Sequence, residues 1–259
     1  MNIKKLAAIL SLSPLCLWAE EIIETEIRNP VKWSVSSTYF SEYLARPGFI
    51  LYDQPVSQNE LVATWKSIYA GLWSSIGLEE SRIRKYDQEY QAYLGYKKAL
   101  GWVLLDGNIR YDVLKELSTQ HDDLWMCDLR MDIHKLPVVQ PYIATRYFHG
   151  VGQNDVSGGW LVWLGVRRVQ DLGFGIFNNE HVRLIVDGSV AHSDGVLDRD
   201  SGWVYGRLNI QLAAPITKRF ALGPQLVVQV PLDDQGKGRT PYTDGTVKVV
   251  WGISASFKF

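Results

Sequence analysis

The stretch TVKVVWGISASFKF, residues 246–259, ends the sequence and predicts its architecture. The residues between its apolar positions are mostly small or charged, such as Gly252 and Lys258. Alternate side chains of a strand point to opposite faces, so one face of this stretch is apolar along its whole length. The stretch is also longer than a typical soluble strand of about 5–6 residues. We therefore expect a strand that turns one face to lipid. The apolar positions are Val247, Val249, Trp251, Ile253, Ala255, Phe257 and Phe259.

The first residues predict export. Lys4 and Lys5 precede an apolar run at residues 6–17, and the small residue Ala19 follows it closely. This arrangement is typical of a secretory signal peptide, and the run is shorter than the roughly 20 apolar residues of a membrane-spanning helix. We place cleavage after Ala19. A lipoprotein with Cys16 as its lipidated residue is the alternative, although the residues before Cys16 match that pattern poorly.

Composition narrows the function classes. The net charge of −1 gives no electrostatic argument for binding nucleic acid. The mean hydropathy of −0.09 would suit a soluble protein. Mean hydropathy does not identify a membrane β-barrel, however, because polar and apolar positions alternate along its strands. Ten Trp and thirteen Tyr are typical of rings at membrane interfaces. After cleavage Cys127 would be the one remaining cysteine, which excludes an internal disulfide.

The remaining sequence reads as strands separated by turn-rich stretches, with no linker between domains. Connections after even-numbered strands are mostly short and those after odd-numbered strands longer, as in outer-membrane barrels. We therefore predict an all-β fold, a transmembrane antiparallel up-and-down β-barrel of about 12 strands over residues 31–259, after a signal peptide (1–19) and a short periplasmic segment (20–30). The predicted strands are residues 33–43, 60–66, 68–76, 89–97, 101–113, 124–133, 138–148, 160–169, 181–192, 202–212, 220–230 and 246–259.

Tryptophans gather at both ends of the predicted strands. Two aromatic girdles, one at each membrane interface, are expected of such a barrel. A soluble β-sandwich with Trp in its core is the alternative, but core Trp would not need to collect at strand ends. Trp125, Trp160 and Trp203 follow the predicted outer loops, and Trp33, Trp65 and Trp102 lie toward the opposite end.

Charged residues alternate with apolar ones in the middle of the predicted barrel. A charge that faces lipid at the midplane costs about 2–4 kcal/mol, so these side chains are expected to point into the lumen. A turn near Gln120 would place Arg110 opposite Asp128, Asn108 opposite Arg130, and Asp106 opposite Asp132. The predicted lumen residues are Asp106, Asn108, Arg110, Asp128, Arg130, Asp132, Arg146, Arg183, Asp187, Arg207 and Lys248.

One early stretch resembles a known family. Arg46, Asp53-Gln54-Pro55 and the strand Tyr69-Ala70-Gly71-Leu72-Trp73-Ser74-Ser75 are similar to the early loop and Tyr-Ala-Gly-x-Trp strand of a family of proteobacterial outer-membrane porins. Arg46-Pro47-Gly48 departs from the Arg-Gly usual there. The resemblance implies a small barrel with a transport role, and it supplies no site residues.

The last strand also resembles the signal by which the barrel-assembly machinery recognises outer-membrane barrels. Such strands end on Phe after apolar residues at alternate positions. The resemblance implies that this machinery and outer-membrane lipid are partners of the chain, and that its assembly signal is formed by Trp251, Ile253, Phe257 and Phe259.

The predicted function is a porin-like channel for passive diffusion of small hydrophilic or charged solutes, without enzymatic activity, cofactor or metal. None of the five His lies in a metal-ligand spacing. One alternative is a structural or adhesive barrel with a closed lumen, whose loops at residues 193–201 and 231–244 bind a partner. A second is an outer-membrane lipid-modifying enzyme that uses His149 and His192 beside Ser157 and Ser193.

Overall fold

The computed structural model describes residues 31–45, 48, 50–80, 88–115, 123–151, 158–175, 181–196, 201–232 and 246–259. The predicted signal peptide and the segment 20–30 lie outside these residues, as do Arg46, Pro47 and Ser157. No helix in the described part of the chain is long and apolar enough to cross a membrane.

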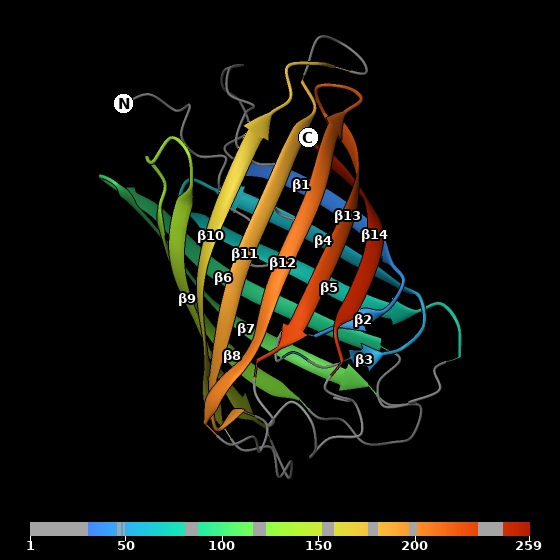
Figure 1. Cartoon of the computed structure of the whole chain (residues 1–259), viewed down its shortest axis with the longest axis vertical. Helices are drawn as coiled ribbons and strands as arrows, with labels where there is room; N and C mark the ends of the chain where they lie inside the picture. The colour runs from blue at the N-terminus through green and yellow to red at the C-terminus, as the bar shows by residue number, and fades with distance from the viewer. Residues whose placement is uncertain are drawn as a thin grey trace.

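Twelve strands form one closed antiparallel barrel, in which each strand pairs with its neighbours along the chain (Figure 1). The predicted fold class and all the predicted strands are confirmed, with shifts at several strand ends. The barrel strands are β1 (Val31–Phe40), β4 (Val56–Trp65), β5 (Ile68–Gly77), β6 (Gln88–Leu100), β7 (Val103–Lys115), β8 (Leu124–Ile133), β9 (Gln140–Gly150), β10 (Gly159–Asp171), β11 (Arg183–Asp194), β12 (Gly202–Pro215), β13 (Phe220–Pro231) and β14 (Lys248–Lys258).

The first and last strands close the barrel. β1 pairs with β14 from Ser34 and Lys258 to Phe40 and Gly252. Beyond this ladder, the Trp33 amide donates to the Phe259 carbonyl at 3.0 Å, and the Phe259 amide donates to the Trp33 carbonyl at 3.1 Å. The terminal stretch 246–259 therefore completes the sheet, and neither β1 nor β14 leaves an unpaired edge.

The outer face of the barrel is apolar, as the alternation predicted. Along β8 buried and exposed residues alternate at every position, with Trp125, Cys127 and Leu129 on the exposed side. Trp251, Ile253, Phe257 and Phe259, the predicted assembly signal, are exposed on the outer face of β14 or just beyond it. The six Trp predicted to form the girdles are also exposed, namely Trp33, Trp65, Trp102, Trp125, Trp160 and Trp203.

A short hairpin interrupts the connection between β1 and β4, where the sequence predicted only a loop. β2 (Tyr43–Leu44) pairs with β3 (Ile50–Tyr52) in a separate two-stranded sheet. Every residue of β3 is buried, so the hairpin lies inside the barrel. A strand that is buried on all sides shows no alternation of apolar and polar residues, which explains why the sequence pattern did not identify it.

Cys127 provides a test of which face is lipid-exposed. In a lipid bilayer its thiol should be shielded from a charged, water-soluble maleimide, because it lies between Trp125 and Leu129 on the outer face of β8. We expect little labelling of the reconstituted barrel and full labelling after denaturation. A Cys127→Ser, Glu80→Cys variant is the control, since Glu80 is exposed at the end of the barrel, and it should label rapidly. Rapid labelling of Cys127 in the intact bilayer would contradict the assigned faces.

Candidate functional site

The predicted lumen residues all lie on the inward face, but in two environments. Arg183, Asp187, Arg207 and Lys248, on β11, β12 and β14, are half-buried. Those on β7, β8 and β9 are buried almost completely, at 6% exposure or less: Asp106, Asn108, Arg110, Asp128, Arg130, Asp132 and Arg146. The side chains of the second group are covered by densely packed neighbours, whereas those of the first keep part of their surface exposed.

The predicted register between β7 and β8 is wrong by two residues. Asp106 faces Arg130, Asn108 faces Asp128, and Arg110 faces Met126. A slip of two residues keeps each side chain on the same face, so the alternation could not detect it. In the ladder, the partner of each β7 residue lies two residues earlier in β8 than predicted. Arg110 still reaches Asp128, but as a diagonal neighbour.

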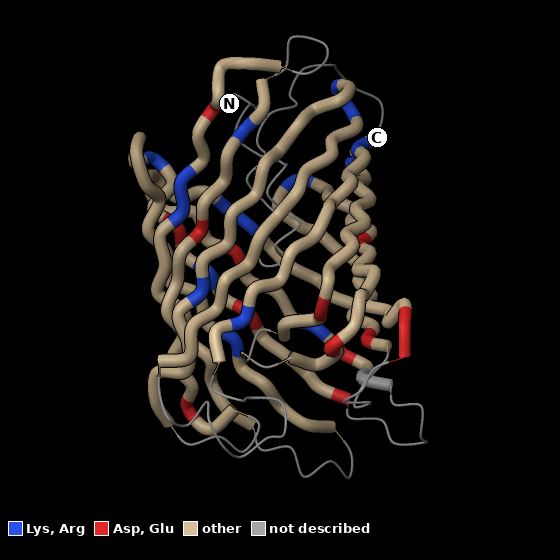
Figure 2. Tube along the Cα trace, turned by 45° about the vertical axis from the view of Figure 1, so that its right-hand side comes forward, with Lys and Arg blue, Asp and Glu red and all other residues tan. Residues whose placement is uncertain are grey.

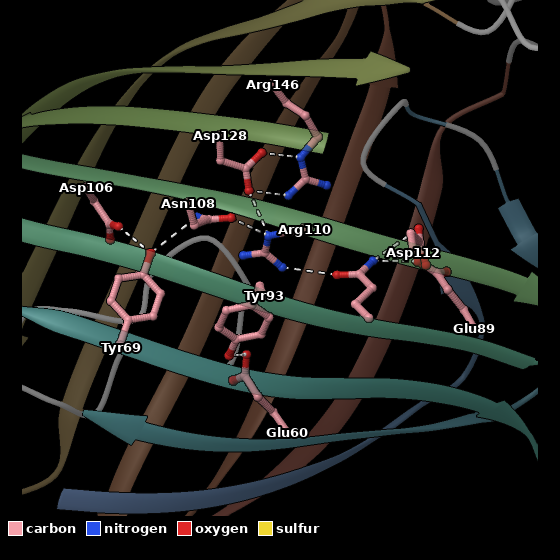
Figure 3. Close-up of polar contacts among 11 residues, drawn as sticks. Glu60, Tyr69, Glu89, Tyr93, Asp106, Asn108, Arg110, Asp112, Asp128 and Arg146 are labelled. Carbon is pink, nitrogen blue, oxygen red and sulfur yellow. Dashed lines mark hydrogen bonds and ion pairs between the residues drawn. The ribbon is translucent and has the colours of Figure 1, made fainter. Parts of the chain in front are cut away.

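Asp128 is the centre of a buried ion network (Figure 3). One of its oxygens, Oδ2, accepts from Arg110 Nε at 2.9 Å and from Arg146 Nη2 at 2.8 Å, and Oδ1 accepts from Arg146 Nε at 2.5 Å. Arg110 also donates to Asn108 Oδ1 at 2.8 Å and to Gln91 Oε1 at 3.0 Å. Buried charges are tolerated only with such partners, so this network fixes β6, β7, β8 and β9 relative to one another.

Two further ion pairs extend the network toward the short turns. Lys97 Nζ lies 3.3 Å from Asp106 Oδ2, and both side chains are buried. Arg130 forms a fork with Asp132, with Nη2 at 2.6 Å and Nε at 3.0 Å from Oδ1. The Arg130 guanidinium also stacks over the Tyr142 ring at 3.8 Å. On the inner face from β6 to β9, which we call the charged wall, Lys97, Arg110, Arg130 and Arg146 thus each pair with a carboxylate.

The Tyr-Ala-Gly motif has a structural explanation in this wall. Tyr69 of β5 faces Gly95 of β6, and Gly71 faces Tyr93, so each tyrosine ring lies over the glycine opposite. A Cβ at Gly95 would lie 2.2 Å from Tyr69 Cζ. The rings lie flat and carry their hydroxyls into the network, where Tyr69 donates to Asp106 at 2.5 Å and Tyr93 donates to Glu60 at 2.6 Å.

Several inward charges are absent from the predicted lumen residues, although the alternation of polar and apolar residues along their strands also places them on the inward face. The predicted strand 60–66 begins at Glu60, but β4 begins at Val56. Glu89 and Lys97 were placed at the ends of the predicted strand 89–97, where the face of a side chain is least certain. All the missed charges are buried: Glu60, Glu89, Lys97, Asp112 and Arg167.

The hairpin formed by β2 and β3, which we call the lumen hairpin, reaches across the interior. On one side the Tyr43 hydroxyl donates to Glu89 Oε2 of the charged wall at 2.6 Å. On the other side Arg207 Nη2 donates to the Ala45 carbonyl at 3.0 Å, and Gln229 Nε2 donates to the Gly48 carbonyl at 2.8 Å. The hairpin is thus held between β6 and the β12–β13 pair.

Apolar packing fills the space around the lumen hairpin. Ala45 and Leu51 belong to one buried cluster with residues from β8 to β12, among them Met126, Phe148 and Tyr205. Gly48 has a φ of 97° and lies so close to Tyr205 that a Cβ would approach Cδ1 to 2.4 Å. Glycine suits both the left-handed conformation and the contact. In the half of the barrel next to the long loops, the hairpin is therefore packed directly against the inner face of β8 to β12.

The inward side chains of β11 and β12 differ in exposure from those of the charged wall. The inward residues Arg183, Asp187, Ser189 and Asn209 are half-buried, in contrast to the buried inward residues of β6, β7 and β8. Asp187 accepts a hydrogen bond from the Tyr142 hydroxyl at 2.7 Å. The inward polar residues of β11 and β12 are therefore less tightly covered than those of the charged wall.

Of the Ser and His residues considered for an enzyme, the structure describes His149, His192 and Ser193, and it does not bring these three together. His149 is exposed on the outer face and stacks on Tyr147. His192 packs edge-on against the exposed Trp203, whereas Ser193 is buried on the inward face. Among the described residues no group of three or more His, Cys, Asp and Glu could hold a metal ion.

The tyrosine–glycine contact leads to a stability prediction. Gly95→Ala should displace the Tyr69 ring from Asp106 and lower the stability of the barrel by about 1–3 kcal/mol, as overpacking does elsewhere. Gly107→Ala is the matched control, because a Cβ there would meet its nearest atom at 3.6 Å, an ordinary contact. Urea unfolding of the refolded barrels would measure both. Equal stability of the two variants would show that the Tyr69 ring is not held by this contact.

Comparisons with known proteins show the fold. No family model matches the sequence, and no curated protein sequence matches it either. Among solved structures, the barrel is similar to the NanC porin, with 12% identity over 88% of this chain and 100% of that chain and a TM-score of 0.53. It is also similar to the KdgM porin, with 7% identity over 87% of this chain and 99% of that chain and a TM-score of 0.52. At such low identities the likeness concerns architecture alone, and this chain shares with these porins the fold of a closed antiparallel β-barrel.

Proposed function

We propose that the chain is an outer-membrane channel for passive diffusion of small hydrophilic or charged solutes. The observation that carries this proposal is the contrast between the two faces of one closed barrel. The outer face is apolar, whereas the inward face carries paired charges on one side and half-buried polar residues along β11 and β12. Channels select by the width of the pore and by the charges and hydrogen-bonding groups that line it.

The lumen hairpin would be the constriction of this channel. The hairpin lies in the connection between β1 and β4. It contacts Glu89 of β6 on one side of the lumen, and Arg207 and Gln229 of β12 and β13 on the other. The charged wall provides a fixed surface on one side, since its arginines are already paired with carboxylates. The path for solutes would then run beside β11 and β12, past Arg183 and Asp187, and around or past the hairpin.

The remaining assignments follow from this proposal. Residues 1–19 would direct export and be removed, and the barrel-assembly machinery would bind the apolar face of β14. The exposed Trp residues would form two girdles in outer-membrane lipid. The strand Tyr69-Ala70-Gly71-Leu72-Trp73 supports a relation to the proteobacterial porins that it resembles. The transport itself would need neither cofactor nor metal.

A structural or adhesive barrel with a closed lumen is the second candidate. The observation that favours it is the apolar cluster around the lumen hairpin, which fills the interior near the long loops. Planar-bilayer recordings of the refolded protein would separate the two. Steady ion-carrying steps support the channel, whereas a silent bilayer supports the closed barrel. Lipid hydrolysis in the same preparation would favour the enzyme, for which the described Ser and His residues offer no assembled site.

Releasing the hairpin should widen the channel. Arg207→Ser with Gln229→Ala removes both side chains that hold the backbone carbonyls of Ala45 and Gly48. We expect single-channel conductance to rise severalfold, because the hairpin would then be held only from the charged wall. Arg183→Ser is the control, since it removes the same charge from an inward position at the short-turn end of β11.

The comparison of the two variants decides the outcome. Loss of a charge alone would change the ion preference of both variants to a similar degree. Release of the hairpin would raise conductance in the Arg207→Ser, Gln229→Ala variant alone. If its conductance matched the parent while the barrel remained folded, the hairpin would not be the constriction.

A further inference from the structure

The end of the barrel with the short turns is cationic. Its exposed basic side chains come from strand ends and turns all around the barrel, and Figure 2 shows blue segments on the turns at its upper end. Among the described residues at this end, Asp171 is the one exposed acidic side chain. We call this set the basic rim, and its members are Lys32, Lys66, Lys98, Lys135, Arg168, Lys218 and Arg219.

Asp171 offsets only one of these positive charges, and its carboxylate is held within its own turn. Its Oδ1 accepts from the Gly173 amide at 2.7 Å and lies 2.9 Å from His181 Nδ1. Among the described residues at the opposite end, the acidic side chains of Glu79, Glu80 and Asp194 are exposed. The two ends of the described barrel would therefore prefer different surroundings.

Two rim lysines lie on tryptophan rings that face outward. Lys66 Nζ is 4.7 Å from the centroid of the Trp65 ring, and Lys135 Nζ is 5.8 Å from that of Trp102. These rings are 44% and 59% exposed on the outer face. Trp rings sit at the headgroup level of a bilayer, so ammonium groups beside them lie at the level of the lipid phosphates.

We propose that the basic rim binds the headgroups of anionic phospholipids, of the phosphatidylglycerol class, in the leaflet at the short-turn end. A zwitterionic headgroup carries no net charge, whereas an anionic one is attracted by every cation within a Debye length, about 8 Å at physiological salt. The Trp–Lys pairs place the charge beside the barrel wall rather than in the lumen. Binding of these headgroups would not depend on whether the lumen conducts solutes.

Quenching of Trp fluorescence by brominated lipids would test the proposal. The barrel beginning at Glu20 would be reconstituted in phosphatidylcholine with brominated phosphatidylglycerol or brominated phosphatidylcholine. We expect phosphatidylglycerol to associate more strongly, and salt to reduce the difference. In a Lys66→Gln, Lys98→Gln, Lys135→Gln variant the preference should fall by about fivefold per effective charge removed. Equal association of the two lipids with the parent barrel would overturn the proposal.

Three controls sharpen the result. Lys→Arg at the same three positions keeps the charge and should keep the preference, and its loss there would overturn the proposal. Lys248→Gln removes a cation from an inward position at the opposite end, and the same fall there would also overturn it. Finally, the acidic segment 20–30 could itself cover the rim. If the preference appeared only after that segment was deleted, the chain and not lipid would occupy the rim.

Discussion

The closed ladder of backbone hydrogen bonds is the constraint on which the rest of this structure depends. In a bilayer no water can satisfy an open sheet edge, so a β-sheet that spans it must close. Pairing of β1 with β14 meets this requirement, down to the reciprocal bonds of Trp33 and Phe259. Once the sheet is closed, each residue faces either outward or into the lumen. The burial of Asp128 and the exposure of Cys127 follow from this single choice.

The inward charges then need ion-pair or hydrogen-bond partners within the small space of the lumen. In the charged wall single carboxylates have two partners each. Asp128 pairs with Arg110 and Arg146, and Asp106 contacts both Lys97 and Tyr69. Leaving one partner of such a pair buried alone would cost several kcal/mol, so the wall stabilises one arrangement of β6 to β9. Its rigidity is therefore a consequence of burial, whatever solute the barrel admits.

Sequence patterns predicted the faces of the strands well because the side-chain period of a strand is two residues. The same reasoning separates His192 from Ser193, which are adjacent in sequence and therefore point to opposite faces. Register is different: Asp106 pairs with Arg130 instead of Asp132, and both lie on the same face. The lumen hairpin shows no alternation of buried and exposed residues in β3, since Ile50, Leu51 and Tyr52 are all buried. Its contacts with Arg207 and Gln229 join residues far apart in sequence, so only the closed barrel reveals them.

The two attachments of the lumen hairpin differ in chemistry, and this difference bears on the proposed channel. Tyr43 donates to the side-chain carboxyl of Glu89, which is buried in the charged wall. On the other side the acceptors are the backbone carbonyls of Ala45 and Gly48, to which the cationic Arg207 and the neutral amide of Gln229 donate. Release from the charged wall would leave the buried Glu89 with Gln91 as its side-chain hydrogen-bond donor, whereas Arg207 is half-buried and can turn toward water when it is released. If the hairpin moves, it should therefore detach first from Arg207 and Gln229 and remain attached at Tyr43, which would open the path beside β11 and β12.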